Sequence, residues 1–278
     1  QGFTSIYDSA DHYWPMRNIS DNTSLDTISY MHAVIMNGAK LNDTKLFGPA
    51  VILDGEDDWI ELRIMGDDCT NIPSECRAGF TISFWLYYID GEFLLCTGVY
   101  NSGNKGPGVK FTFEQQKFVI EISTLKYTWK ITSKLIARTW VHVAFKWTTN
   151  EGIHLFLNGS AVLQRESPRK EVSFDKPKYG RGWSIGRPND LLKLTEYGKL
   201  GIAHLALWQR ELTAIEIKSA FIETILKDKE KLLEMLRTPK QPIPSQRASS
   251  NGVMLTFQHA VIAASLLFPA FFISIMIF

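Results

Sequence analysis

Short runs that alternate apolar and polar residues fill the middle of the chain and limit the folds open to it. In residues 80–87 (FTISFWLY) every second residue is a large hydrophobic one. An alternation with a period of two is typical of a β-strand that buries one face. Residues 109–114, 117–122 and 127–132 repeat the pattern between polar connections. Many short strands at near-regular spacing predict an all-β fold, an antiparallel jelly-roll sandwich.

Turn residues join some of these predicted strands. Residues 140–148 and 153–158 flank Asn150 and Gly152, which predicts a hairpin, and Asn158 with Gly159 predicts a second turn. The charged segment 160–181 that follows is predicted to be a surface loop.

From Thr213 the hydrophobic spacing changes to three and four residues, which predicts a helix with an apolar stripe. Thr213 is the expected N-cap, with Glu216 as its capping-box partner. The second half of the helix, KDKEKLLEMLR, is highly charged and is expected to leave the globular body. The proline-containing segment after it predicts an extended stalk. The predicted domains are a jelly roll over 1–226, the charged helix end and stalk over 227–259, and a hydrophobic tail over 260–278.

The tail 260–278 contains no charged residue, and as a helix it would span roughly 28 Å, close to the thickness of a bilayer core. Three interpretations stay open. A lipid-anchor signal would be cleaved near Ser250 or Asn251, a transmembrane helix would keep the tail, and a truncated receptor would continue beyond it. The missing basic flank favours the anchor signal. Each interpretation places the head outside the cell, at the plasma membrane.

Cysteines and glycosylation sequons agree with a secretory route. The four sequons begin at Asn18, Asn22, Asn42 and Asn158. Cys69 and Cys76 flank the short loop CTNIPSEC, which a local disulfide can close. A metal site is the alternative, but no His or further Cys lies close in sequence. Cys96, in the apolar run FLLC, is expected to be a buried free thiol.

The remaining composition excludes several function classes. The net charge of +1 gives no reason to expect a nucleic-acid partner. The six His are scattered, and His142 and His154 fall on predicted strands, where a structural role is expected. The sequence has no phosphate-binding loop, nucleophile elbow or zinc spacing.

Several segments together resemble the laminin-G-like and pentraxin-like family of concanavalin-type jelly rolls. They are AVILDGEDDWIEL (50–62), FTISFW (80–85), TWVHVAF (139–145), NG (158–159), WSIG (183–186) and LALWQRELT (205–213). They occur in the family's order, and the resemblance covers about residues 13–225. Within it, HYWP (12–15) and CTNIPSEC are similar to the extracellular head of some adhesion G-protein-coupled receptors.

The resemblance implies a non-catalytic recognition or adhesion module at the cell surface, with a glycan or protein ligand and no required cofactor. The head of a truncated adhesion-type receptor is an alternative. Because the family often binds calcium through carboxylates, Asp54, Glu56 and Asp58 are candidate ligands. The family's acidic pair before the last strand's Trp is replaced here by Ala203 and His204, which leaves the role of that pair open. The oligomeric state does not follow from the sequence.

A catalytic alternative rests on Glu56, Asp58 and Glu61, which fit the E-x-D-x-x-E pattern of one class of jelly-roll β-glucanases. Retaining hydrolysis needs two carboxylates about 5 Å apart. On a strand, Glu56 and Asp58 would share a face, and Glu61 would need a bulge to join them. The competing interpretation is a solvated acidic turn with Trp59 and Leu62 packed below it. We expect the chain not to be an enzyme.

Overall fold

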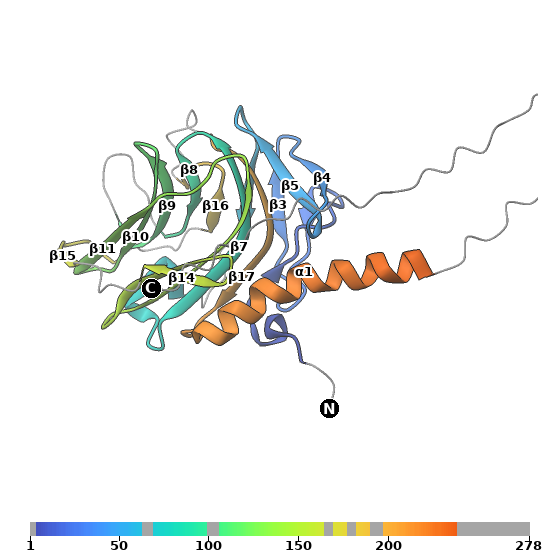
Figure 1. Cartoon of the computed structure of the whole chain (residues 1–278). Helices are drawn as coiled ribbons and strands as arrows, with labels where there is room; N and C mark the ends of the chain where they lie inside the picture. The colour runs from blue at the N-terminus through green and yellow to red at the C-terminus, as the bar shows by residue number, and fades with distance from the viewer. Residues whose placement is uncertain are drawn as a thin grey trace, which may run out of the picture. The chain divides into compact units, whose positions relative to one another are not determined.

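Two antiparallel β-sheets pack face to face in the part of the chain that the structure describes (Figure 1). This computed structural model describes residues 4–62, 69–98, 106–163, 169–176, 182–189 and 197–237. All of these belong to one unit, Gln1–Thr238. The predicted tail, the predicted stalk, and the anchor candidates Ser250 and Asn251 lie outside the described residues.

Sheet A has eight strands and sheet B has nine. Sheet A runs in the order β14 (Ser160–Leu163), β13 (Gly152–Leu157), β12 (Trp140–Thr148), β7 (Phe80–Asp90), β17 (Lys199–Trp208), β5 (Gly48–Asp54) and β4 (Lys40–Thr44), and β1 (His12–Trp14) also pairs with β17. Sheet B runs in the order β15 (Arg169–Glu171), β11 (Tyr127–Ser133), β10 (Lys117–Ser123), β9 (Gly108–Glu114), β8 (Phe93–Cys96), β16 (Trp183–Ile185), β6 (Trp59–Leu62), β3 (Ala33–Met36) and β2 (Thr23–Ser24). The structure therefore confirms an antiparallel sandwich.

The predicted strand runs are confirmed as β7 and β9 to β13, but the surface loop predicted over 160–181 is wrong in part. Asn158 and Gly159 both have positive φ, of 50° and 74°, as a tight hairpin turn requires. This turn sends Ser160–Leu163 back along β13 as β14. Further on, β15 pairs with β11. Both segments are edge strands, which polar sequences can also form.

Strand β7 shows why so many aromatic residues are buried. Phe80, Ile82 and Phe84 point into the core between the sheets. On the opposite face Trp85 is only 2% exposed, because it packs with Phe47 and with residues of the C-terminal helix. Sheet A is thus covered on both faces, which its alternating sequence pattern does not reveal.

The outer cover of sheet A comes from η1 (Ile6–Ser9) and α1 (Ala214–Arg237). The capping box is confirmed: the Glu216 N–H donates to Thr213 Oγ1 (3.2 Å), and the Thr213 N–H donates to Glu216 Oε2 (2.8 Å). The Tyr7 hydroxyl donates to the Ala220 carbonyl (2.9 Å) and joins the two helices. The domain boundary predicted at residue 226 falls inside α1, which continues to Arg237.

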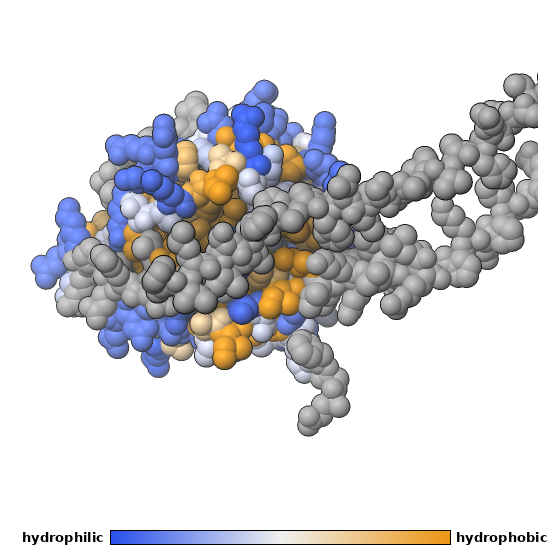
Figure 2. Space-filling model, viewed as in Figure 1, coloured by the Kyte–Doolittle hydropathy of each residue, from blue (hydrophilic) through white to orange (hydrophobic). Residues whose placement is uncertain are grey.

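Hydrophilic residues make up much of the outline of the visible face in Figure 2, and hydrophobic residues show nearer its middle. Among the described residues, no helix combines the length and the apolar character needed to cross a bilayer.

Candidate functional site

Two connections that are far apart in sequence meet at one end of the sandwich: the β5–β6 loop with the strand residue on each side of it, residues 54–59, and the turn after β16, residues 186–189. Gly186 has a φ of +86°, and a Cβ placed on it would lie 3.4 Å from the Asp58 carbonyl oxygen and 3.7 Å from Trp59 Cα. The pairing of Ile185 with Ile60 sets this approach. We call these two segments the rim site.

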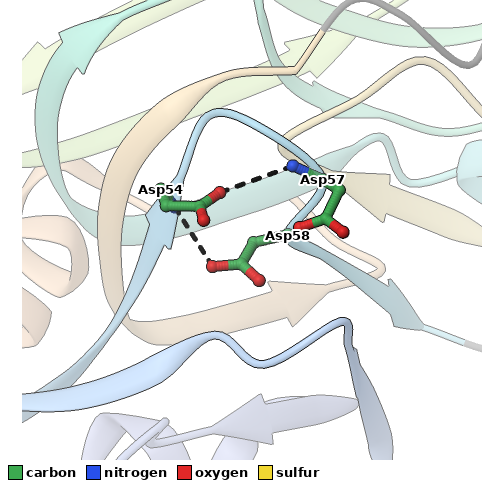
Figure 3. Close-up of side chains that lie close together, drawn as sticks. All are labelled: Asp54, Asp57 and Asp58. Atoms are coloured by element: carbon green, nitrogen blue, oxygen red, sulfur yellow. Dashed lines mark hydrogen bonds between the residues drawn. The ribbon is translucent and has the colours of Figure 1, made fainter.

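Three carboxylates gather in the β5–β6 loop (Figure 3). Asp54, Asp57 and Asp58 each offer an oxygen within 4.8 Å of the others. Asp54 Oδ1 accepts the N–H of Glu56 (2.8 Å) and that of Asp57 (3.4 Å). Asp58 Oδ2 accepts the Asp54 N–H (3.2 Å). These bonds fold the loop back on itself, because a short acidic side chain can replace a backbone acceptor in a turn.

The carboxylates of this loop differ in electrostatic environment. Hydrogen bonding, chiefly from the Glu56 N–H, lowers the pKa of Asp54. Burial raises the pKa of Asp58, and the negative charges of Asp54 and Asp57 add to the shift. A carboxylate with a raised pKa beside two others marks a place where a cation would relieve repulsion.

The structure brings together only part of the predicted acidic sites. Of the calcium candidates, Asp54 and Asp58 belong to the cluster, but Asp57 takes the place expected for Glu56. For the catalytic alternative, Glu56 and Asp58 would share a face only on a strand, but both lie in the loop, and β6 begins at Trp59. Glu61 lies within β6 and is not a member of the described carboxylate cluster.

Arg187 is the residue of the rim site that the sequence did not single out. Its guanidinium carbon lies 3.5 Å from the centroid of the Trp59 ring. The residue is 7% exposed, and its Nε is buried without a hydrogen-bond partner. No ion pair engages this guanidinium in the part of the chain that the structure describes. An Arg after the WSIG segment carries no sequence signal, because the stacking depends on pairing between β6 and β16.

Hydrogen bonds fix the turn that carries Arg187. Ser184 Oγ donates to the Arg187 carbonyl (3.0 Å), and the Gly198 N–H donates to the Gly186 carbonyl (2.6 Å). Asn189 Nδ2 donates to the Gly98 carbonyl (2.6 Å). The Arg187 side chain therefore leaves a backbone that neighbouring strands hold in place.

The predicted disulfide is confirmed between Cys69 and Cys76, with their Cα atoms 5.0 Å apart. The loop contains η2 (Cys69–Asn71) and η3 (Pro73–Glu75). Asn71 Oδ1 accepts the Gly98 N–H (2.9 Å), so the loop supports the same strand end that Asn189 contacts. Because both sulfurs are bonded to each other, the metal-site alternative for this loop is wrong.

Cys96 is a buried free thiol, as expected. Burial raises its pKa to about 12, so the thiol stays protonated at neutral pH. A protonated, buried sulfur is a poor nucleophile.

A second polar cluster, which the sequence did not reveal, joins His12, Asp26 and Ser29. His12 Nδ1 lies 2.8 Å from Asp26 Oδ2 and 2.7 Å from Ser29 Oγ. The Ser29 hydroxyl also donates to Asp26 Oδ2. In a nucleophilic triad the hydroxyl and the carboxylate contact different ring nitrogens. Here both contact the same one, so this cluster holds the 26–29 turn and does not activate a nucleophile.

All four predicted glycosylation residues are exposed: Asn18, Asn22, Asn42 and Asn158. Asn42 lies on the edge strand β4, and Asn158 lies in the turn between β13 and β14. Asn158 Oδ1 accepts the His142 N–H (3.0 Å). Their modification stays a prediction.

A laminin-G-type family model, described as the concanavalin A-like lectin/glucanases superfamily, matches residues 54–218, more than half of the chain. The chain belongs to this superfamily. Its name covers both binding proteins and hydrolases, so membership alone does not fix an activity. The matched segment contains both parts of the rim site.

Curated relatives of this lectin/glucanase-superfamily chain include adhesion G-protein-coupled receptor D1. The human protein is 25% identical over 222 residues, which cover 78% of this chain and 24% of the receptor. The Bos taurus protein is 22% identical over 245 residues, 78% of this chain and 26% of the receptor. The chain spans about a quarter of the length of these relatives.

Solved structures share the concanavalin-like fold at low sequence identity. The binding domain of botulinum neurotoxin serotype D has a TM-score of 0.56 at 13% identity, covering 79% of this chain and 52% of that chain. A sialidase from Trypanosoma rangeli has a TM-score of 0.54 at 13% identity, covering 79% and 33%. A related neurotoxin binding domain, in complex with rat synaptotagmin II, has a TM-score of 0.54 at 14% identity, covering 79% and 52%. These likenesses show the fold alone.

Proposed function

We propose that the chain is the extracellular head of a cell-surface protein and acts as a non-catalytic module that binds a glycan or protein ligand. The observation that carries this proposal is the rim site, where carboxylates and an arginine lie together on two connections held by a rigid sandwich. Loops on a rigid scaffold are the usual location of binding residues. The adhesion-receptor relatives support a surface role.

The arrangement of carboxylates supports binding over hydrolysis. Glycoside hydrolysis needs a spaced pair of carboxylates, one to protonate the leaving oxygen and one on the opposite side of the sugar. Asp54 and Asp58 instead accept backbone N–H groups of their own loop. Glu61 lies on β6 and is not a member of their cluster.

Calcium binding at the cluster is part of this proposal. The loop bonds leave the second oxygens of Asp54 and Asp58 and the carboxylate of Asp57 for a cation. Hard oxygen ligands of this kind suit calcium, which takes six to eight oxygens, with carbonyls and water filling the rest. Calcium would then lower the repulsion within the loop and stiffen it.

Membrane attachment through residues 260–278, by a lipid anchor or a transmembrane helix, is also proposed. So are glycosylation of the four sequons and the alternative that the chain is the head of a longer receptor. Release of the full chain from cells by a phosphatidylinositol-specific phospholipase would support the anchor. Retention would favour a protein span.

The recognition role is tested on cells that display the full chain. Panels of multivalent glycan probes and candidate receptor ectodomains are applied, and binding is compared with cells that lack the chain. We expect saturable binding of at least one probe, reduced by Asp57→Ala. A chain that binds nothing and cleaves β-glucan, with cleavage lost in Glu56→Gln and Glu61→Gln, would contradict the proposal.

The calcium proposal has its own measurement, the thermal midpoint of the full chain with calcium and with a chelator. At a calcium concentration one hundred times the Kd, binding adds about 2.7 kcal/mol to the free energy of unfolding. Asp57→Asn should remove this gain, whereas Glu56→Gln should keep it. Equal midpoints with calcium and chelator would show that the cluster is only a turn.

A further inference from the structure

Resting on the proposed recognition function, we propose that Arg187, stacked on Trp59, binds the carboxylate of an acidic sugar residue. The first argument is burial without a partner. Arginine is almost never this deeply buried unless it is paired, and a buried donor without an acceptor costs free energy. Arg187 is 7% exposed, its Nε has no acceptor, and its guanidinium contacts the Trp59 ring. Because Nε itself is buried, a ligand acceptor would bind the two terminal Nη groups of the guanidinium.

The second argument is orientation. A guanidinium is a planar fork whose parallel N–H groups match the two oxygens of a carboxylate. The guanidinium carbon lies 3.5 Å from the centroid of the Trp59 ring, and this close contact limits how the fork can turn before any ligand arrives. The Ser184 and Gly198 hydrogen bonds fix the turn beneath it. Because little side-chain freedom remains, binding costs less entropy than it would at a mobile surface arginine.

The third argument comes from the neighbouring loop, which narrows the ligand. The carboxylates of Asp54, Asp57 and Asp58 lie within one loop beside the Arg187 turn. Ionised carboxylates are hydrogen-bond acceptors only, so they suit the hydroxyl donors of a sugar. Their charges also repel a ligand with several negative charges, such as a phosphate or a polysulfated chain. A sugar with a single carboxylate and free hydroxyls matches both sides of the rim site.

The test uses the full chain displayed on cells and soluble polymers that carry 3′-sialyllactose, glucuronic acid or lactose, with polyglutamate as a carboxylate lacking sugar hydroxyls. Two variants remove the fork: Arg187→Gln removes the charge, and Arg187→Lys keeps the charge but not the planar geometry. Lys126→Gln, at an exposed lysine in the β10–β11 turn, is the matched control for loss of one positive charge. Surface display of each variant is measured with an antibody to confirm folding.

We expect wild-type binding of an acidic-sugar polymer over lactose, weakened roughly ten- to hundredfold by either Arg187 variant. Lys126→Gln should leave the affinity unchanged, and Trp59→Phe should cost less than Arg187→Gln because a stacking surface remains. A chelator added throughout separates direct contact from a bridging calcium ion. Loss of the Arg187 effect in chelator would overturn direct recognition.

The remaining outcomes separate this inference from the function on which it rests. Preference for lactose or equal binding of polyglutamate would overturn the acidic-sugar assignment, as would full binding by well-displayed Arg187→Gln. Each of these would leave a recognition role intact. Binding to no glycan and no receptor ectodomain would overturn both proposals.

Discussion

Two buried basic side chains, Arg187 and His142, show how differently one sandwich treats a side chain that can carry charge. Both contact a tryptophan: Arg187 lies 3.5 Å from the Trp59 ring centroid, and the His142 ring lies 5.5 Å from that of Trp85. Both have ring or guanidinium nitrogens without hydrogen-bond partners. One is at the rim, and the other is beneath α1.

The two side chains differ in whether they can lose their proton when they are buried. Histidine loses its proton when it is desolvated, and burial lowers the pKa of His142 to about 3. The ring is therefore neutral at physiological pH and acts as packing between Trp85 and Phe221. Arginine keeps its charge in proteins, so Arg187 stays an unpaired cation. His142 is therefore neutral packing beneath α1, whereas Arg187 keeps its positive charge at the rim, where we propose that an anionic group binds it.

The largest expected effect is a loss of folding stability in acid, because protonation places a charge on the buried ring of His142. In the unfolded chain His142 binds a proton below pH 6.5, but in the folded chain it does not until about pH 3. This residue therefore costs no stability above pH 6.5, and the free energy of unfolding falls as the pH drops from 6.5 toward 3. The total loss from this residue is about 4–5 kcal/mol. Urea unfolding measured at several pH values gives the slope.

Other groups titrate in the same range, so the control must isolate His142. The pKa values of three carboxylates are lowered in the folded chain, so their protonation in acid also reduces the free energy of unfolding. These residues are Asp54, Glu114 and Glu216. His142→Phe keeps an aromatic ring in the same cage and should flatten the slope between pH 6.5 and 5. Parallel slopes for wild type and His142→Phe would show that the ring is solvated or paired.

Removing the disulfide should loosen the rim and leave the helix-covered face intact. A crosslink over this short loop contributes about 2–3 kcal/mol by limiting the unfolded chain. Cys69→Ser with Cys76→Ser should therefore lower the free energy of unfolding by that amount. Since Asn71 and Asn189 both bind Gly98, the variant should also weaken acidic-sugar binding through Arg187. The acid slope set by His142 should not change.

Cys96→Ala is the matched control, because it removes a cysteine and keeps the disulfide. Its thiol is buried in β8, so some packing is lost, but Arg187-dependent binding should persist. If the double serine variant unfolds at the same urea concentration as wild type, the crosslink does not support the rim.

Local sequence patterns predict the parts of this molecule that local forces decide. The alternation in β7, the Thr213 and Glu216 capping box, and the Cys69–Cys76 loop each depend on residues close in sequence. The same patterns miss what distant pairing decides. Trp85 alternates with core residues and reads as outward-facing, yet α1 buries it.

The rim site shows the same limit within a few residues. The sequence pointed to Glu56 with Asp54 and Asp58, but backbone hydrogen bonds of the turn bring in Asp57 instead. Arg187 reaches Trp59 only because β16 pairs with β6. Pairing between such distant segments leaves no mark at either position, and one sequence therefore could not identify this contact.

The smallest expected effect comes from the N-cap of α1, the helix that covers His142. Thr213→Ala removes the oxygen that accepts the Glu216 N–H, at an expected cost of about 1 kcal/mol. Because α1 covers His142, fraying of its first turns should speed chemical modification of that histidine by diethyl pyrocarbonate. Thr213→Ser keeps the hydroxyl and should behave as wild type. Equal modification rates in Thr213→Ala and Thr213→Ser would mean that the cap does not control access to His142, and that other contacts of α1, such as those with Tyr7 and Trp85, are enough to hold the helix over this histidine.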